Sequence, residues 1–191
     1  MPPKALAANR EAKSQSLYAW PECFARLAIA MKDSRPLTTG EISLARSVFG
    51  DAIDYSKVKM VKRKWWPFQP RSAAMAPTGN IHFHPHGDLW SEDFAAEGLH
   101  RQGLFIHELT HVWQTQTRGH FYLPLMRHPF CRYAFEIKEG WPFVRYGLEQ
   151  QAEIVRHAFL LRHGMKLPGV ADVATYDFLV DFPGTLRREI R

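Results

Sequence analysis

Apolar side chains recur at helical intervals in three parts of the chain. The capping-box sequence that begins at Thr38 precedes such a pattern, which ends at Gly50 and predicts a helix over residues 39–49. A second helix is predicted from about residue 99 to residue 117. A third is predicted within the sequence YGLEQQAEIVRHAFLLRHG, residues 146–164, where basic residues in the last turn and a closing glycine are typical of a helix C-terminus.

Strand patterns lie between the first two helices. The sequence KVKMV, residues 57–61, is strand-prone, and GNIHFHPHG, residues 79–87, alternates apolar and polar positions as a strand does. Pro85 stops the second strand and suggests that it lies at a sheet edge. Residues 120–142 are predicted to form a loop and residues 165–191 a turn-rich tail. The order of elements predicts an α+β fold in a single domain.

Residues 1–36 differ in composition from the rest, mixing Pro, Lys, Ser and Ala, and we expect a partly ordered N-terminal arm followed by a domain over residues 37–191. The 191-residue chain is 46% hydrophobic, which is enough for a hydrophobic core without disulfides. Its two cysteines, Cys23 and Cys131, are far apart and imply neither a disulfide framework nor a cysteine metal site.

The formal net charge is +6, and basic residues gather at residues 57–71 beside Trp65, Trp66 and Phe68. Such a mixture can meet nucleic acid, an anionic cell envelope or an acidic protein, although the pattern favours a strand with a solvated lysine face followed by a Pro-containing turn. No apolar run approaches the roughly 18 residues that span a bilayer. The N-terminus also lacks a signal-peptide pattern, so we expect synthesis in the cytoplasm and export by another route.

Candidate chemistry enters with the sequence HELTH at residues 107–111. Two histidines four apart lie on one helix face and can both bind one zinc ion, while Glu108 can act as general base on an attacking water. The surrounding helix is apolar on most sides, which indicates burial, and buried polar groups need partners. The alternative is a pair of core histidines that bind no metal.

A catalytic zinc site requires a third protein ligand. Position 117 is threonine, so the extended motif with a third histidine is absent. The predicted last helix offers Glu149 and Glu153 on one face. One carboxylate can bind the metal while the other accepts a hydrogen bond from a ligand histidine and fixes its tautomer.

The HELTH sequence followed by Glu149-x-x-Ala152-Glu153 resembles the gluzincin metallopeptidases, whose second motif is Glu-x-x-x-Asp or Glu-x-x-Ala-Asp. By this resemblance Glu149 is the third zinc ligand and Glu153 takes the place of the aspartate that supports a ligand. Glutamate at that place departs from the pattern, so either carboxylate stays open as the ligand.

A wider resemblance, over about residues 38–164, is to the Vgr-related metallopeptidase domains of bacterial type VI secretion, which occur alone or as C-terminal extensions of VgrG spike proteins. It is carried by the segments LTTGEISLARSVFGDAIDYSKVK, GNIHFHP, FIHELTHVWQ and LEQQAEIV. The resemblance implies a zincin-like fold with an active-site helix, a small sheet with an edge strand and a second ligand-bearing helix. It also implies a Zn²⁺ cofactor, a spike-type carrier, an immunity protein and delivery to the periplasm of a target cell.

Further polar residues are candidates for the substrate groove and for stabilising an oxyanion. His82, His84 and His86 lie on and after the predicted edge strand, where a substrate can pair by β-augmentation. A solvated cleft edge is favoured for them over a second metal site. An oxyanion donor is also needed, and the candidates are Tyr146, His157 and Tyr176.

The sequence therefore predicts a zinc metallopeptidase that acts as an antibacterial type VI effector on peptide bonds of a protein or of peptidoglycan. One alternative is a non-catalytic zinc-binding structural or cargo protein of a contractile injection system. Another is a DNA-associated zinc protease that uses residues 57–71, although the pattern disfavours nucleic acid as a partner.

Overall fold

The computed structural model describes residues 33–126 and 133–183. The chain divides into two compact units, residues 1–35 and residues 36–191, and strand β1 (Ser34–Pro36) spans the division. The predicted N-terminal arm lies almost wholly outside the described residues, as do Cys23 and Cys131. None of the helices in the described ranges is long and apolar enough to cross a membrane.

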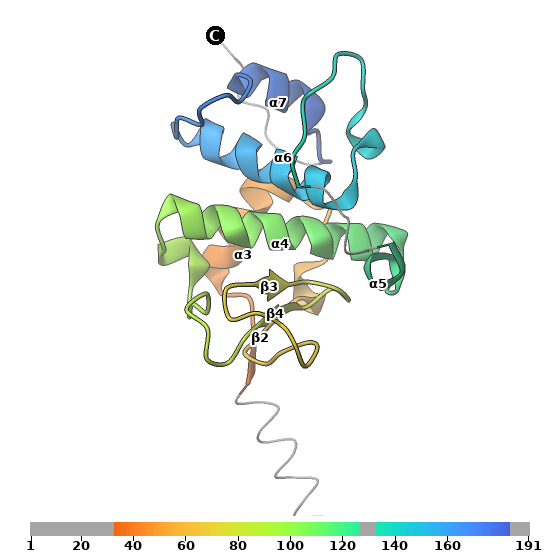
Figure 1. Ribbon diagram of the computed structural model, residues 1–191. Helices are drawn as coiled ribbons and strands as arrows, with labels where there is room; N and C mark the ends of the chain where they lie inside the picture. Colours follow the sequence, from red (N-terminus) through yellow and green to blue (C-terminus); the bar gives the residue numbers. More distant parts are fainter. Residues whose placement is uncertain (1–32, 127–132, 184–191) are drawn as a thin grey trace, which may run out of the picture. The chain divides into compact units, whose positions relative to one another are not determined.

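The second unit is mixed α and β, as predicted (Figure 1). Its elements follow in the order α3 (Thr39–Phe49), η1 (Tyr55–Lys57), β2 (Lys59–Val61), β3 (Ala74–Met75), β4 (Ile81–Phe83), η2 (Phe94–Ala96), α4 (Leu99–Arg118), α5 (Tyr122–Met126), η3 (Phe143–Arg145), α6 (Leu148–Arg162) and α7 (Val173–Leu179).

The three predicted helices are confirmed as α3, α4 and α6, with ends within two residues of the predicted ones. The capping box of α3 forms as expected, since the Thr38 hydroxyl accepts from the Glu41 amide and the Glu41 carboxylate accepts from the Thr38 amide. The other carboxylate oxygen of Glu41 accepts from the amide of Phe94 at 3.0 Å. This fully buried glutamate thus joins α3 to η2 and has its hydrogen bonds satisfied.

Residues 81–83 form the strand predicted within residues 79–87, but its predicted position at a sheet edge is wrong. Strand β4 lies inside the sheet, paired in parallel with β2 and antiparallel with β3. The edge belongs to β3, a two-residue strand that ends the order β2-β4-β3. The proline that suggested an edge, Pro85, follows the last paired residue and costs the ladder no hydrogen bond.

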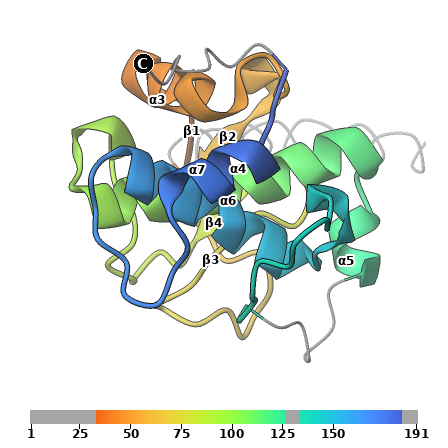
Figure 2. The same ribbon diagram turned by 90° about the horizontal axis from the view of Figure 1, so that it is seen from above.

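Helix α4 lies between the sheet and α6 (Figure 1), and the view from above shows α7 and α6 over it (Figure 2). This central position explains why α4 is buried on most sides, as the sequence predicted. The helices α4 and α6 approach closely at Gly103, where a Cβ atom would lie only 3.1 Å from Leu160 Cδ2. The close approach brings the polar faces of α4 and α6 within hydrogen-bonding distance of each other.

Two helices were not predicted. Helix α5 lies in the region predicted as a loop, and it is a five-residue helix with a proline inside. Helix α7 lies in the predicted turn-rich tail, where Asp172 caps it by accepting from the Thr175 amide. Tyr176 of α7 is buried in the core, so tertiary packing stabilises a helix whose seven residues carry a weak local signal.

Candidate metal centre

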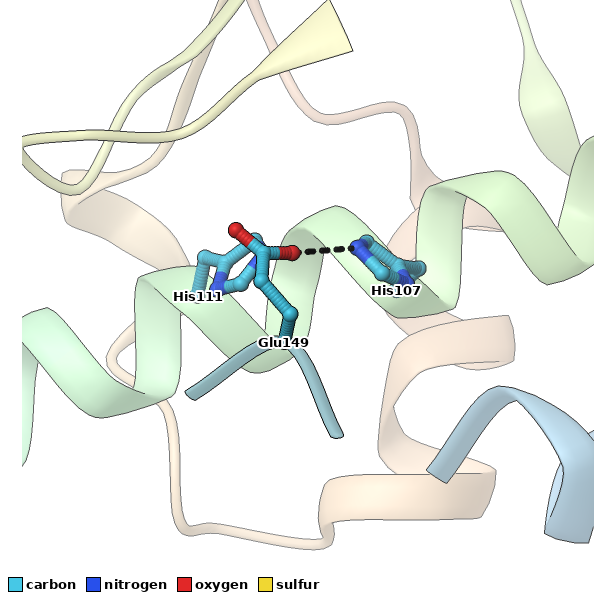
Figure 3. Close-up of side chains that lie close together, drawn as sticks. All are labelled: His107, His111 and Glu149. Carbon is cyan, nitrogen blue, oxygen red and sulfur yellow. Dashed lines mark hydrogen bonds and ion pairs between the residues drawn. The ribbon is translucent and has the colours of Figure 1, made fainter. Parts of the chain in front are cut away.

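The two HELTH histidines and Glu149 come together at the crossing of α4 and α6. One ligand atom from each of His107, His111 and Glu149 lies within 4.8 Å of the other two, and all three residues are buried. Figure 3 shows the Glu149 carboxylate reaching from α6 to the two imidazole rings on α4. Within residues 33–126 and 133–183 no other group of three or more His, Cys, Asp or Glu residues is gathered in this way.

The distances place one carboxylate oxygen between the rings. Oε2 of Glu149 lies 3.5 Å from His107 Nε2 and 3.2 Å from His111 Nε2. Four-residue spacing on α4 puts both Nε2 atoms on one face, and α6 supplies the opposing carboxylate. Two neutral nitrogens and one carboxylate oxygen form a donor set typical of zinc.

Hydrogen bonds around His111 fix its tautomer. The Gln114 amide nitrogen donates to the carbonyl of Leu148 and to Gln151 Oε1, so Gln114 Oε1 must be the atom that faces His111. His111 Nδ1 then donates to that oxygen over 2.9 Å. In the neutral ring, the Nε2 lone pair therefore points at the Glu149 carboxylate. Two acceptors facing each other require a proton or a metal ion between them, so this geometry suits a bound cation.

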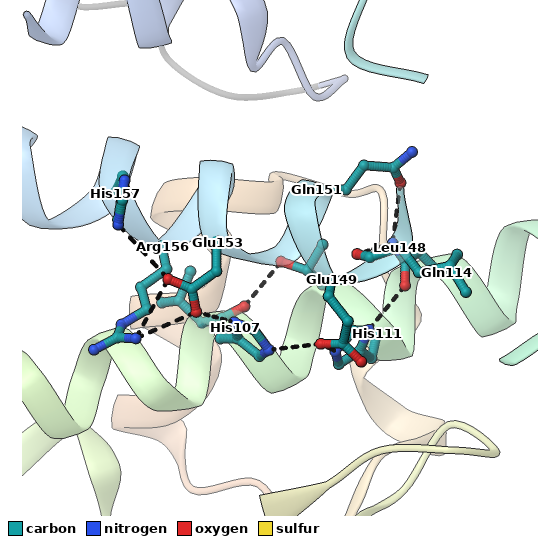
Figure 4. Close-up of polar contacts among 11 residues, drawn as sticks. His107, His111, Gln114, Leu148, Glu149, Gln151, Glu153, Arg156 and His157 are labelled. Atoms are coloured by element: carbon teal, nitrogen blue, oxygen red, sulfur yellow. Dashed lines mark hydrogen bonds and ion pairs between the residues drawn. The ribbon is translucent and has the colours of Figure 1, made fainter. Parts of the chain in front are cut away.

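Glu153 supports the other histidine. Its Oε1 lies 2.9 Å from His107 Nδ1, while its two oxygens are 3.3 and 3.5 Å from an Arg156 guanidinium nitrogen. Figure 4 shows this network continuing along α6 to His157, whose Nε2 lies 3.6 Å from Glu153 Oε2. The carboxylate beside Nδ1 favours a proton on that nitrogen, which leaves Nε2 facing Glu149.

These contacts change the ionisation of both partners. Burial lowers the pKa of His107, but hydrogen bonds to Glu149 and Glu153 and the charge of Glu108 outweigh it and raise the pKa to about 9. Burial raises the pKa of Glu153, whereas His107 and Arg156 lower it, and the net direction is downward. Without a metal, the centre therefore holds a proton on His107 at neutral pH. A cation that binds there must displace this proton.

Glu108 lies beside His107, at a pocket of about 450 Å³. Its side chain is 5% exposed, and its Oε2 has no hydrogen-bond partner among the described residues. A buried carboxylate oxygen without a partner is unusual in a folded protein and is often found at a functional site. The pocket is lined by α4, α6, the edge strand β3 and the loop before it. Glu108 can therefore contact a molecule that enters this pocket.

Three predicted oxyanion donors lie elsewhere. The Tyr146 hydroxyl accepts from the amide of Lys138, and the Tyr176 hydroxyl lies 3.2 Å from His157 Nδ1. None of Tyr146, His157 and Tyr176 lines the pocket. The structure gives His157 a different place, at the outer end of the Glu153 network.

The histidines of residues 82–86 also lie away from the pocket lining. His82 Nδ1 contacts the carbonyl of Arg63, and burial lowers its pKa. His84 Nδ1 accepts from the amide of His86. The groove position expected for them depended on the edge-strand prediction, and β3 occupies that position instead.

Four residues at the centre were missed by the sequence interpretation. Gln114 follows His111 by three residues on a buried helix, a spacing that could have identified it as a support for that ring. Trp66, Tyr133 and Arg156 line the pocket but carry no motif that marks them. The Tyr133 ring stacks on His107 at 6.4 Å between centroids.

No model of a known protein family matches the chain. The chain is 43% identical over 134 residues to the type VI secretion system spike protein VgrG2b of Pseudomonas aeruginosa. That match covers 66% of this chain but only 13% of the length of the spike protein.

A solved structure matches as well. The effector domain of Pseudomonas aeruginosa VgrG2b has 37% sequence identity to this chain and a TM-score of 0.62. The match covers 75% of this chain and 80% of the solved domain. Identity at this level over most of a domain shows common descent, and the chain belongs to the family of VgrG2b effector domains.

Proposed function

We propose that the protein is a zinc-dependent metallopeptidase that serves as a type VI secretion effector. The observation that carries the proposal is the convergence of His107, His111 and Glu149 within 4.8 Å, next to a buried Glu108 oxygen without a partner. Three protein ligands with a position left for water or substrate are the pattern of catalytic rather than structural zinc.

The donor set fits the ion, since His₂Glu is an established ligand combination for catalytic zinc. When bound, Zn²⁺ supplies a Lewis acid that polarises the scissile carbonyl and lowers the pKa of the attacking water. Glu108 accepts a proton from that water and passes it to the leaving amine. During the reaction Gln114 and Glu153 hold the two imidazoles with Nε2 toward the metal position.

The edge strand suggests how a substrate is positioned. Both residues of β3, Ala74 and Met75, line the pocket, and the outer edge of this strand is unpaired within the described chain. An extended peptide can add to such an edge by main-chain hydrogen bonds, which would place its backbone beside Glu108. Trp66 and Tyr133 provide aromatic surfaces at the pocket for the flanking side chains.

The family suggests the biological setting. VgrG2b is a spike protein with an effector domain, so we expect this chain to travel on a spike of the VgrG type. The proposed substrate is a peptide bond in a protein or in peptidoglycan of the target periplasm, with an immunity protein as the expected inhibitor.

The proposal predicts zinc-dependent cleavage. The purified protein is incubated with a mixed peptide library and with peptidoglycan sacculi, and new amino termini are detected by mass spectrometry. We expect products with the zinc-loaded protein, none after chelation, and recovery when zinc is restored. If neither substrate is cleaved, and toxicity persists in variants that lack a zinc ligand, the non-catalytic structural or cargo function would be favoured.

The supporting residues give a second prediction. Replacing Glu153 by glutamine removes the charge that fixes His107, and replacing Gln114 by alanine releases His111. Each change is expected to weaken zinc binding about 10- to 100-fold, the usual effect of losing a partner of a ligand histidine. The measurement is competition with a zinc chelator, and the exposed Glu139→Gln serves as the control. Unchanged affinity in both variants would contradict the roles given to these contacts.

A further inference from the structure

The net positive charge of the chain arises from one segment. Residues 55–87 contain six Lys and Arg residues and no Asp or Glu. The rest of the chain holds the other 19 basic residues against all 19 acidic ones, so its formal charge is zero. Lys57 is paired with Asp54 at 2.8 Å, so the other five basic residues of the segment create the local positive field.

Exposed aromatic side chains lie in the same segment. Residues 62–73 join β2 to β3, and within them Trp65 is 42%, Trp66 43% and Phe68 78% exposed. The Trp66 and Phe68 rings contact each other edge to face at 5.4 Å. We call residues 62–73 the aromatic-basic loop. Large apolar side chains exposed together on a folded domain mark an interaction surface.

Hydrogen bonds hold this loop in a defined shape. The buried side chain of Gln69 accepts from the Trp65 amide and donates to the carbonyls of Ala73 and His82. Gly87 then lies against the loop, where a Cβ atom would meet the Arg71 carbonyl oxygen at 2.2 Å. The aromatic side chains are therefore exposed by a supported backbone, which reduces the ordering cost of binding.

Exposed basic side chains lie in the same segment as the aromatic ones. Arg63, Lys64 and Arg71 are exposed within the loop, and Lys59 is exposed on the adjacent strand β2. Lys64 donates to the Pro67 carbonyl, which keeps its charge beside the rings. The loop and the adjacent strand thus expose aromatic and basic side chains together.

We propose that the aromatic-basic loop docks on the surface of an anionic lipid bilayer. Trp and Phe side chains enter the interfacial region of a bilayer, and flanking Lys and Arg pair with anionic headgroups. A single-stranded nucleic acid would instead require separate ring faces along a basic groove. Here the edge-to-face contact joins Trp66 and Phe68 into one apolar patch.

Docking in this way also orients the pocket. Trp66 belongs both to the loop and to the lining of the pocket that contains Glu108. A protein held by this loop has its pocket close to the bilayer surface. The proposal concerns binding only and does not require the chain to be a peptidase.

The test is co-sedimentation of the full chain with vesicles of phosphatidylcholine alone or mixed with phosphatidylglycerol. We expect binding to the anionic vesicles only, falling steeply as salt is raised. Arg63→Gln with Arg71→Gln should weaken partitioning about fivefold for each cation removed. Trp65→Ala with Phe68→Ala should also weaken it, and both pairs leave the pocket residue Trp66 intact.

Matched controls lie outside the loop. Phe178, the most exposed aromatic residue of α7, is replaced by alanine, and Arg46 with Lys166 by glutamine. These controls should retain vesicle binding, and melting temperatures verify that every variant is folded. The proposal is overturned if the chain does not bind anionic vesicles, or if the controls lose as much vesicle binding as the loop variants. It is also overturned if the loop variants keep vesicle binding and instead lose binding to peptidoglycan sacculi or DNA.

Discussion

Replacing Glu108 by glutamine is expected to abolish hydrolysis while leaving the metal bound. The amide cannot take the proton of the attacking water, and general acid–base catalysis contributes about 10²- to 10⁴-fold to rate. Glutamine has nearly the same shape as glutamate, and Oε2 of Glu108 accepts no hydrogen bond from the described residues. The substitution should therefore leave the fold and the positions of His107 and His111 unchanged.

The measurement has two parts for the Glu108→Gln variant. Zinc content is determined by elemental analysis, and activity is followed both as peptide cleavage and as growth inhibition when the protein is directed to the bacterial periplasm. The exposed Glu139→Gln is the control for loss of a carboxylate. Full toxicity and full cleavage in the Glu108 variant would contradict the assigned general base.

Replacing Glu149 by alanine is expected to remove the metal rather than the proton transfer. This residue supplies the only carboxylate oxygen within the group of three ligand atoms, and it reaches the rings from the opposite helix. Its loss leaves two histidines on one helix, so zinc affinity should fall by more than the roughly 100-fold upper effect of losing a supporting partner. Activity should fall with zinc occupancy.

The control for this variant is Glu153→Ala, because the two glutamates lie four residues apart on the same face of α6. The structure places Glu149 at the Nε2 atoms and Glu153 at His107 Nδ1. The two substitutions should therefore lower zinc affinity to different extents. Chelator competition measures both affinities. If Glu153→Ala removed the zinc and Glu149→Ala retained it, the assignment of ligand and support would be reversed.

Much of the centre could be predicted because its signals are local. The HELTH spacing puts two rings on one helix face, and the same rule places Glu149 and Glu153 on one face of α6. Local spacing left open which of the two glutamates faces the histidine pair. That depends on how α6 crosses α4, and Gly103 allows a close approach that no periodicity reveals.

The sheet shows the opposite case. Strand order depends on contacts between segments distant in sequence, and a two-residue strand such as β3 carries no periodic signal. The alternating pattern of residues 79–87 therefore identified β4 as a strand but gave it the wrong neighbours. The expected groove role of its histidines was linked to that error, because β3 lies between β4 and the edge.

The aromatic-basic loop illustrates a third limit. Its composition was visible in the sequence, which favoured a strand with a solvated lysine face followed by a Pro-containing turn for residues 57–71. Residues 59–61 form that strand, and the aromatic residues follow it in a loop whose shape depends on hydrogen bonds of Gln69. No sequence pattern in this segment identifies Gln69 as the buried residue that organises the loop.

Anomalous diffraction at the zinc edge, from a crystal of the unmodified protein, tests the central proposal most directly. A catalytic zinc site predicts one strong anomalous peak, located among His107 Nε2, His111 Nε2 and Glu149 Oε2 and about 2 Å from each, as zinc ligands require. Crystals grown with zinc that show no peak there, or a peak only at other residues, would contradict the metal centre and the peptidase function built on it.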